Sequence, residues 1–238
     1  MVKKVLIDER GKKFFWERGD FHTQFGYVKE KDIKNKKIVE THLGKKFYVV
    51  EPKFIDLIKK IKRGPQIPMP KDIAIIIYYS SIDKNSIVVD AGTGCGFLAI
   101  SLARFVKKVV SYEVNKHYIK IARENIKLFN AKNVKIKNKN IEEGIDEKNV
   151  DLVVLDLPEP WKVLDHAQKA LKSGAFLVCY LPTIVQVMKL VEYAKRRNFI
   201  VTKVLEILER GWFVEEKKVR PKNKIIGHSA FIVFSRRI

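Results

Sequence analysis

The chain has 238 residues, of which 48 are lysine or arginine and 27 are aspartate or glutamate, so its formal net charge is +21. A chain of this length can bury a sizeable core and can hold one large domain or a large domain with a small one. The excess of positive charge favours a polyanionic partner, and nucleic acid is the commonest. Solubility alone, or the lysine and glutamate richness of a heat-adapted protein, would also account for the charge.

The apolar runs are all shorter than the roughly 20 residues needed to cross a bilayer. The amino terminus also lacks the apolar core of a signal peptide. We therefore expect a cytoplasmic protein without a membrane partner. The two cysteines, Cys95 and Cys179, have no metal-ligand spacing around them, so we expect neither a metal site nor a disulfide scaffold.

Residues 1–65 are predicted to form a small β-rich basic domain. Short apolar stretches such as KVLID, KFFWE and KFYVVEP alternate with the turn signals ERGK, ERGD and LGKK. Positions 1–70 hold 18 basic and 9 acidic residues, a denser excess than in the rest of the chain. This domain is therefore the candidate for binding RNA. Its aromatic residues could stack on bases, although most are expected in its core.

A bridge with three prolines, RGPQIPMPKD, covers residues 63–72. Pro70 is well placed as the first residue of a helix that continues through Ile73 and Ile76. Gln66 could face a ligand of the following domain, or it could be a plain linker residue. The rest of the chain, residues 66–238, is predicted to be the larger domain.

The stretch SIVVDAGTGCGFL, residues 86–98, predicts a buried strand that leads into a glycine turn and a helix. Glycine tolerates positive φ and has no Cβ, so the turn at Gly92, Gly94 and Gly96 can bring bare backbone against a ligand. Dinucleotide sites space their glycines G-x-G-x-x-G, but here the spacing is G-x-G-x-G. A simple tight turn is the alternative. Glu113 ends the next predicted strand, where its carboxylate could accept both hydroxyls of a ribose.

Further strands and helices alternate along the chain. Strands are predicted at residues 133–138, in DLVVLDL before Pro158, in AFLVCYLP and at residues 229–234. Helices are predicted along Tyr118 to Phe129, from Pro160 through Leu171 with Gly174 as the stop, and after Thr183 as the cap. This alternation specifies a doubly wound α/β sheet that binds ligands at the carboxyl ends of its strands.

The glycine turn, with the acid before it and VVSYE after it, resembles the first two motifs of class I S-adenosylmethionine-dependent methyltransferases. DLPEPW, ERGWFVEEKKVRP and IIGHSAF make the resemblance more specific, as does DERGKKFFWERGDFHTQFG near the amino terminus. Together these motifs resemble the tRNA (adenine-N1)-methyltransferase family, which modifies adenine 58 of the T-loop and, in archaeal members, also adenine 57. The resemblance covers nearly the whole chain and implies a Rossmann-like fold, S-adenosylmethionine as cofactor, tRNA as partner and a homotetramer.

The resemblance also implies roles for residues. Asp156 is the catalytic residue and Tyr180 lies near the target base. The cofactor-binding residues are Asp90, Gly92, Thr93, Gly94, Cys95, Gly96, Phe97, Glu113, Asn140 and Asp156. Two motifs depart from the family: Met69 stands where a tyrosine is common, and Lys139 and Asn140 replace a Gly-Asp pair. An asparagine carbonyl can still accept from an adenine amino group, but without a charge.

The chemistry needs no base, because adenine N1 already carries a lone pair. The methylated base is a cation, so a fixed carboxylate such as Asp156 would stabilise the charge that develops. A helix cap is the alternative role of Asp156. The target adenine must leave the tRNA fold to reach a recessed methyl group, and Tyr180 could stack on it or belong to the core. His228 and Arg220 receive no catalytic role.

Two other classes of function compete with this prediction. A small-molecule methyltransferase, such as one acting on a corrinoid precursor, would share the sheet and the glycine turn but would not need the charge of +21. A catalytically inactive RNA-binding module would keep the charge but would have no use for Glu113 and Asp156 at strand ends.

Overall fold

The computed structural model describes residues 2–62, 64, 67–215 and 218–238. Gln66 of the bridge, for which a ligand contact is one of two expectations, lies outside these residues. The chain divides into two compact units, Met1–Ile61 and Lys62–Ile238. Across the described residues, no helix combines the length and the apolarity needed to cross a bilayer.

The first unit is the β-rich region that the turn signals predict. Four of its strands form an antiparallel sheet in the order β2-β1-β6-β5. The strands β3 and β4, which come between β2 and β5 in the sequence, form a separate hairpin. The elements are β1 (Lys4–Ile7), β2 (Lys13–Trp16), β3 (Phe21–Thr23), β4 (Gly26–Val28), α1 (Glu30–Asn35), β5 (Ile38–Glu40), β6 (Lys46–Val50), α2 (Phe54–Leu57) and the 3-10 turn η1 (Ile58–Lys60).

Aromatic rings form much of the core of this unit. Phe14, Phe21 and Phe47 meet edge to face, with ring centroids 5.4 to 5.9 Å apart, an arrangement that aromatic pairs prefer. Trp16 is buried and its indole N–H donates to the Gly19 carbonyl over 2.7 Å. These aromatic residues are core, as expected for most of them. Tyr27 is 36% exposed.

The second unit is built on a seven-stranded sheet in the order β12-β15-β11-β10-β7-β8-β9. Its strands are β7 (Ile87–Ala91), β8 (Lys108–Glu113), β9 (Val134–Asn138), β10 (Val150–Leu155), β11 (Leu171–Leu181), β12 (Phe199–Glu206) and β15 (Phe231–Arg237). The five strands from β11 to β9 are parallel, whereas β15 runs antiparallel to both β11 and β12. The expected doubly wound α/β fold is confirmed.

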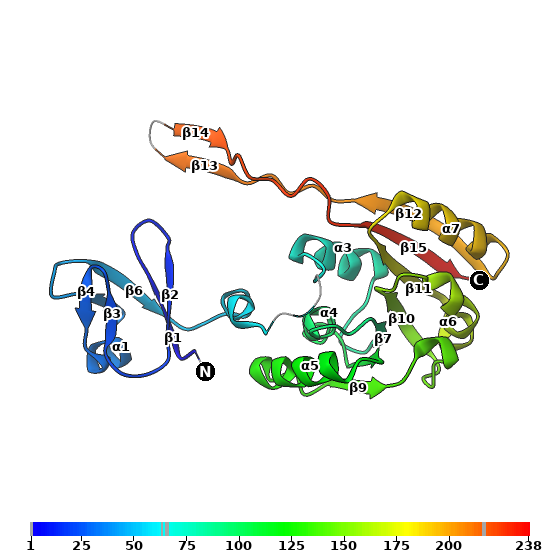
Figure 1. Ribbon diagram of the computed structural model, residues 1–238, viewed down its shortest axis with the longest axis horizontal. Helices are drawn as coiled ribbons and strands as arrows, with labels where there is room; N and C mark the ends of the chain where they lie inside the picture. Colours follow the sequence, from blue (N-terminus) through cyan, green and yellow to red (C-terminus); the bar gives the residue numbers. More distant parts are fainter. Residues whose placement is uncertain (1, 63, 65–66, 216–217) are drawn as a thin grey trace. The chain divides into compact units, whose positions relative to one another are not determined.

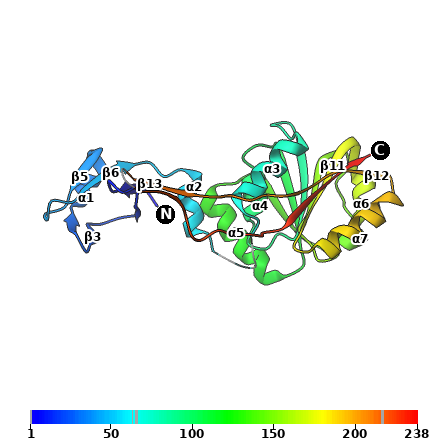
Figure 2. The same cartoon turned by 90° about the horizontal axis from the view of Figure 1, so that it is seen from above.

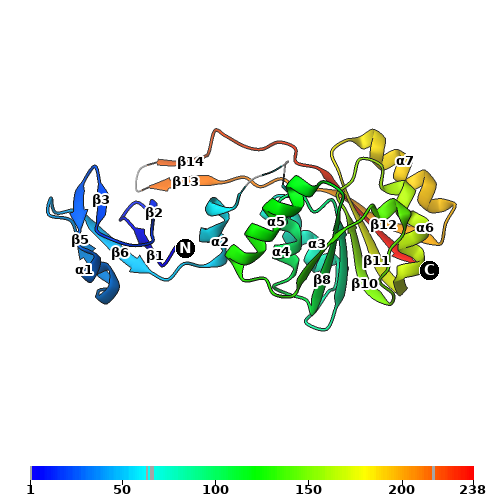
Figure 3. The same cartoon turned by 60° about the horizontal axis from the view of Figure 1, so that its bottom comes forward.

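Helices cover both faces of this sheet. The helices α3 (Pro70–Ser80), α4 (Phe97–Leu102) and α5 (Lys116–Phe129) pack on one face, and α6 (Leu164–Ala170) and α7 (Ile184–Lys195) pack on the other (Figures 2 and 3). The 3-10 turns η2 (Ile141–Glu143) and η3 (Pro160–Val163) follow β9 and β10. Pro70 is the first residue of α3, and Thr183 caps α7 by accepting from the Gln186 N–H, as predicted.

Two expectations about element bounds were wrong. The helix expected from Pro160 through Leu171 is a 3-10 turn followed by α6, and Leu171 is already the first residue of β11. Gly174 therefore lies inside a strand, with φ of 76°, where its carbonyl accepts from Arg236 Nε over 2.9 Å. The early start of β11 is accommodated by a register shift against β10 between Val150 and Leu152.

The strands between residues 199 and 221 were not predicted from the sequence. β12 is one of them, and β13 (Trp212–Glu215) pairs with β14 (Lys218–Pro221) in a hairpin. The hairpin projects as an arm from the rest of its unit (Figure 1). Its strands expose Trp212, Val214 and Val219, so they lack the alternation of buried and exposed residues that marks a strand against a core.

Candidate functional site

The glycine turn lies between β7 and α4, and its three glycines all have positive φ: 87° at Gly92, 51° at Gly94 and 83° at Gly96. Residues other than glycine rarely adopt this backbone conformation. Space is a second constraint at Gly92, because a Cβ there would lie 2.1 Å from the carbonyl oxygen of Asp156. The turn thus brings its backbone directly onto the residue that follows β10.

The neighbouring strand β8 holds the turn in place. The carbonyl of Tyr112 accepts from the N–H groups of Gly92 and Thr93 and from the Thr93 hydroxyl, the last over 3.0 Å. The Thr93 hydroxyl also lies 2.5 Å from the Ser111 hydroxyl. These contacts fix the turn relative to the end of β8, where Glu113 stands.

Glu113 is half-buried, and its carboxylate is bound to the turn itself. Oε2 accepts from the Gly94 N–H over 3.0 Å, and Oε1 accepts from the N–H groups of Val114 and Asn115, both over 2.9 Å. The carboxylate is therefore oriented by three backbone donors beside the cavity described below. The two carboxylate oxygens have four lone pairs between them, and these donors use three, so one lone pair of Oε2 remains to accept a further hydrogen bond.

Asp90 lies beneath the turn and is 1% exposed. The Ser111 hydroxyl donates to its Oδ2, whereas Oδ1 has no hydrogen-bond partner among the described residues. Burial raises the pKa of Asp90 to about 6, against the lowering effect of the Ser111 hydrogen bond and with a further rise from the charge of Glu113. Asp90 supports the turn from below and does not line the cavity above it.

A cavity of about 420 Å³ opens at the carboxyl ends of the strands, where the fold predicts a ligand site. Of the residues singled out from the sequence, eight line it: Gly92, Thr93, Gly94, Cys95, Phe97, Glu113, Asp156 and Tyr180. Its wall also includes residues that were not singled out, among them Pro68, Tyr118, Pro158, Gln186 and Ser229. The size is within the usual range of small-molecule sites.

Three of the singled-out residues do not line this cavity: Asp90, Gly96 and Asn140. Gly96 is the N-cap of α4, and a Cβ there would lie 3.1 Å from the Ala122 Cβ. Asn140 caps η2, and its side-chain oxygen accepts from the Glu142 N–H over 3.0 Å. The structure thus gives both residues a local structural role.

Asp156 directly follows β10, and its N–H donates to the Ala91 carbonyl over 2.9 Å. Burial, and secondly the charge of Asp90, raises the pKa of the Asp156 carboxyl to about 7. Among the described residues, no hydrogen-bond donor to this carboxyl is present that would stabilise its charged form. A cation in the cavity would do so, and would lower this pKa.

Tyr180 also lines the cavity, and its hydroxyl belongs to a buried polar network. Its hydroxyl donates to Asp72 Oδ2 over 2.9 Å, and the Ser229 hydroxyl donates to the same oxygen over 2.8 Å. Lys71 Nζ donates to Asp72 Oδ1 and to the Ser229 hydroxyl, both over 2.6 Å. Asp72 is fully buried. The network joins the start of α3 to β11 and to Ser229, which lies just before β15, and it holds the Tyr180 ring at the cavity wall.

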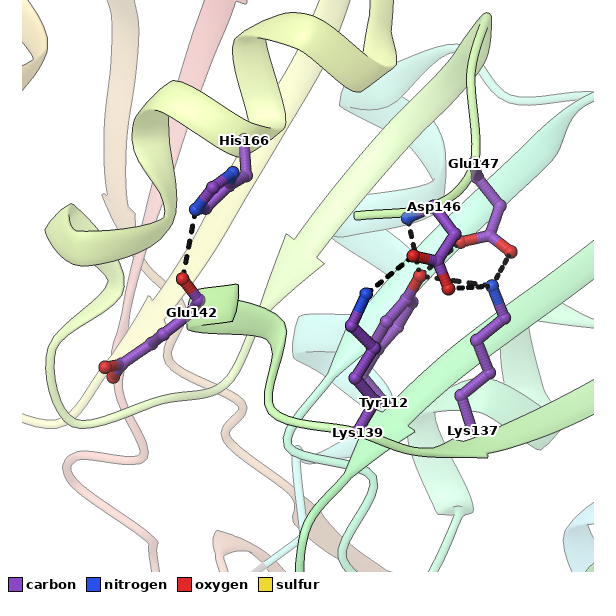
Figure 4. A network of polar contacts seen from close by, with 7 residues as sticks. All are labelled: Tyr112, Lys137, Lys139, Glu142, Asp146, Glu147 and His166. Atoms are coloured by element: carbon purple, nitrogen blue, oxygen red, sulfur yellow. Dashed lines mark hydrogen bonds and ion pairs between the residues drawn. The ribbon is translucent and has the colours of Figure 1, made fainter. Parts of the chain in front are cut away.

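A second polar cluster holds Tyr112, the residue before Glu113 in β8 (Figure 4). The Tyr112 hydroxyl donates to Glu147 over 2.5 Å and accepts from the Asp146 N–H over 3.0 Å. Lys137 pairs with Glu147 and Asp146 at 2.5 and 2.9 Å, and Lys139 pairs with Asp146 at 2.6 Å. Hydrogen bonds from Lys139 and Lys137 lower the pKa of Asp146 to about 2. This cluster ties the loop after η2 to the strand that carries Glu113.

Asn125 of α5 connects the bridge to the glycine turn. Its amide accepts from the Lys62 N–H and donates to the Lys62 carbonyl, both over 2.9 Å, and also donates to the Cys95 carbonyl over 2.8 Å. The buried residues of α5 are Ile119, Ala122 and Asn125, whereas the apolar spacing had indicated Tyr118, Ala122, Ile126 and Phe129. The sequence signal that could have identified Asn125 is its place three residues after Ala122, where helical spacing puts a polar side chain on the apolar face of α5.

Asp72 and Ser229 were missed for a different reason. Asp72 lies in the first turn of α3, where an acidic residue is ordinary because it favours the helix dipole. Two of its partners, Tyr180 of β11 and Ser229 just before β15, are more than a hundred residues away in the chain. Cys95 and Cys179 are both buried.

Comparison with known proteins identifies relatives along the whole chain. The family model described as the tRNA methyltransferase complex GCD14 subunit matches residues 48–236. The tRNA (adenine(57)-N(1)/adenine(58)-N(1))-methyltransferase TrmI of Methanocaldococcus jannaschii is 38% identical, over 98% of this chain and 94% of its own length.

Solved structures agree with this relationship. The tRNA (m1A58) methyltransferase TrmI of Aquifex aeolicus has a TM-score of 0.85 and 28% identity, and the match covers 99% of this chain and 96% of that one. A Thermotoga maritima protein named as an SAM-dependent O-methyltransferase has a TM-score of 0.90 and 31% identity, over 100% of this chain and 93% of its own. The two names differ in the atom that receives the methyl group.

A likeness to the corrinoid enzymes is weaker. The precorrin-6y C5,15-methyltransferase of Geobacter metallireducens has a TM-score of 0.63 and 18% identity, over 75% of this chain and 96% of its own. At this identity the likeness shows a common fold and nothing about the substrate. The family model, by contrast, spans most of the chain. The chain therefore belongs to the tRNA methyltransferase family described by the GCD14 model.

Proposed function

We propose that this protein transfers a methyl group from S-adenosylmethionine to N1 of adenine 58 in the T-loop of tRNA, with adenine 57 as a second candidate target, because the archaeal relative is named for both positions. The observation that carries the proposal is the pairing of Glu113 and Asp156 on one cavity, with the glycine turn between them. One carboxylate stands where a ribose can bind, and the other stands where a methyl acceptor can approach.

The residues of the cavity fit the cofactor. The Glu113 carboxylate is already oriented by three backbone donors, and the remaining lone pair of its Oε2 can accept from a ribose hydroxyl. At Gly92 the absence of a side chain leaves the backbone bare beside Asp156, and the carboxyl of Asp156 has a raised pKa that a nearby cation would lower. When bound, S-adenosylmethionine would supply the methyl group on a positively charged sulfur.

Asp156 would act on the charge that develops on the base. Adenine is neutral before methylation and cationic afterwards, so a carboxylate near its amino group interacts more strongly with the transition state than with the ground state. Asp156 is only partly exposed, so water screens that interaction less than it would at the protein surface. The network around Asp72 would hold Tyr180 at the wall on the substrate side of the cavity.

Binding of tRNA is supported by the net charge of +21, since cationic side chains that contact phosphates release counterions. We assign residues 1–65 to RNA binding and residues 66–238 to catalysis. Because tRNA is the substrate, we also place the protein in the cytoplasm.

We further propose a homotetramer. The arm of β13 and β14 exposes 54% of Trp212, 71% of Val214 and 67% of Val219. A two-stranded hairpin without a packing partner is at best marginally stable in water, so a second copy of the chain is a fitting cover for it.

The proposal is tested by incubating the purified protein with S-adenosylmethionine and an unmodified tRNA transcript, and by mapping modified nucleosides by mass spectrometry. We expect 1-methyladenosine at position 58, or at positions 57 and 58. A ribose 2′-O-methyl group, another methylated base or no product would contradict the proposal. Methylation of tRNA would exclude a corrinoid-type substrate as the main activity, and binding of the cofactor would exclude an inactive RNA-binding module.

A further inference from the structure

A second cavity, of about 390 Å³, lies between α5 and the end of β9. Six residues line it: Lys116, Ile119, Lys120, Arg123, Glu124 and Asn138. The three cationic residues follow the spacing i, i+4 and i+7, so they lie on one face of the helix. Ile119 is 5% exposed and forms part of the floor. The result is a shallow groove with positive charge along one wall, here called the α5 groove.

The cations of the α5 groove are only weakly neutralised by their surroundings, since Lys120 interacts with Glu124 through space without an ion pair. The one carboxylate in the lining, Glu124, pairs with Lys62 at 2.5 Å. Within the described ranges, Lys116, Lys120 and Arg123 form no ion pair with any carboxylate. Unpaired surface cations in a concave site create a positive potential that attracts anions.

The neighbouring strand shows a contrasting arrangement. On β9 and just after it, Lys137 and Lys139 are held by Asp146 and Glu147 (Figure 4). A hydrogen bond to Glu147 is the main factor that raises the pKa of Lys137, against the effect of burial. The charges of these two lysines are neutralised by ion pairs within the protein. Lysines close together in the fold thus divide into a paired set, which stabilises the loop after η2, and the unpaired set of the α5 groove.

The α5 groove begins beside the catalytic cavity. α5 starts three residues after Glu113, and Tyr118 in its first turn lines the cavity that contains Glu113 and Asp156. Asn138, at the other side of the groove, is the last residue of β9 and therefore lies at the carboxyl edge of the sheet. An RNA whose base enters the cavity can pass its backbone over this edge.

We propose that the α5 groove binds the phosphate backbone of the RNA strand that carries the target adenine. This inference rests on the proposed function and adds to it a contact surface on the catalytic unit, separate from the basic amino-terminal unit. Phosphate contacts of this kind fix the register of a nucleic acid without reading its sequence. Lys116, Lys120 and Arg123 would set how the strand lies when the base enters the cavity.

The test compares two triple variants that each remove three positive charges. The groove variant is Lys116→Gln with Lys120→Gln and Arg123→Gln. The control variant is Lys84→Gln with Lys107→Gln and Lys108→Gln, which are exposed residues at the amino ends of β7 and β8. Glutamine resembles lysine and arginine in helix propensity, so α5 should remain folded. Affinity for the tRNA transcript is measured at several salt concentrations, and affinity for S-adenosylmethionine is measured as a check on folding.

We expect the groove variant to bind tRNA at least tenfold more weakly at low salt. Each lost phosphate contact should reduce the slope of log affinity against log salt by roughly 0.7 to 0.9, so three should reduce it by roughly 2 to 3. The control variant should stay within about twofold of the wild type, and both variants should bind the cofactor normally.

A groove variant that binds tRNA like the control would overturn the inference and leave the proposed function intact. A wild-type protein that binds no tRNA would overturn both. If the groove variant lost cofactor affinity as well, the three single variants would separate a folding defect from a loss of phosphate contacts. At least one single variant with normal cofactor affinity must then show weakened tRNA binding, or the inference is wrong.

Discussion

A Cβ at Gly92 would lie 2.1 Å from the carbonyl oxygen of Asp156, so the glycine turn and the end of β10 touch at a distance that only glycine permits. The Asp156 N–H also donates to the carbonyl of Ala91, the last residue of β7. This hydrogen bond holds the residue after β10 against the end of β7. The residue proposed to stabilise the methylated base is thereby held against the turn proposed to bind the cofactor.

We expect Gly92→Ala to destabilise the second unit and to abolish most of the cofactor binding. The positive φ of 87° costs about 1 to 2 kcal/mol for a residue with a Cβ, and the clash adds a cost typical of overpacking, about 1 to 3 kcal/mol. Gly174→Ala is the matched control, because its φ is 76° but its Cβ would meet nothing closer than 3.5 Å. Urea unfolding of both variants measures the difference, and equal destabilisation would show that the clash is relieved.

The fold was predictable because its signals are local. A β-branched run, a glycine turn and helical spacing identify the sheet and its ligand-binding edge without any knowledge of tertiary contacts. The same reasoning placed Glu113 and Asp156 correctly at strand ends that line one cavity. Position along a strand is sufficient information for that, because all parallel strands end at the same edge.

Other parts of the site depend on contacts that spacing cannot show. The hydrogen bond of Tyr180 to Asp72 joins residues from β11 and α3, and the sequence contains no signal for their pairing. Asn140 was expected beside the cofactor because it follows β9, but its side chain is bound to the Glu142 N–H as a helix cap. Asparagine competes in this way for nearby backbone donors, and a strand-end position does not reveal which partner it will take.

Glu113→Gln and Glu113→Ala should both weaken binding of S-adenosylmethionine. A hydrogen bond to a charged group contributes about 1.5 to 3 kcal/mol, which corresponds to roughly a tenfold to a hundredfold change in affinity. Alanine should have the larger effect, because Gly94, Val114 and Asn115 also lose an acceptor. Titration calorimetry measures both, with the exposed Glu143→Ala as the control. Unchanged affinity in the alanine variant would remove Glu113 from the cofactor site.

Replacing Asp72 by asparagine should destabilise the second unit, because the buried ammonium group of Lys71 would lose its carboxylate partner. Asp72 accepts from Tyr180, Ser229 and Lys71, and removing one partner of a buried ion pair costs about 3 to 5 kcal/mol. The double change Asp72→Asn with Lys71→Met removes both charges and should recover part of that loss. Urea unfolding of the two variants and the wild type is the measurement. A double variant no more stable than Asp72→Asn would show that the charge of Lys71 is not the cause.

Stability of the unliganded protein should fall as the pH rises from about 5 to about 8. Asp90 and Asp156 have folded-state pKa values raised to about 6 and about 7, so the native state binds more protons than the unfolded state over this range. The pKa of His228 is also raised, chiefly by Glu206, and its contribution is lost in the same direction. Asp156→Asn should flatten the pH dependence by roughly 1 to 3 kcal/mol.

This dependence is measured by urea unfolding at several pH values, followed by the fluorescence of Trp161 in a variant that keeps it as the single tryptophan. Trp161 is buried in the second unit, so its signal reports the unit that contains both aspartates. The carboxyls whose pKa is lowered by lysine partners, such as Asp146, are ionised in both states over this range and contribute little. A steeper pH dependence in Asp156→Asn would contradict the assignment.

The rate of methyl transfer should depend on the charge of Asp156 and much less on its shape. Asp156→Asn keeps the size of the side chain and one acceptor oxygen but removes the charge that would stabilise the cationic product. The loss of one such preorganised group typically lowers the rate roughly a hundredfold to a thousandfold, whereas tRNA affinity should change far less. Single-turnover measurements with saturating protein and cofactor separate the two, because they report the chemical step alone.

The wild-type rate should also rise with pH as the carboxyl ionises, with a midpoint below the unliganded pKa of about 7, since the bound cation favours the carboxylate. The asparagine variant should lack this rise. If Asp156→Asn transferred the methyl group at the wild-type rate under saturation, the carboxylate that follows β10 would have no part in the reaction.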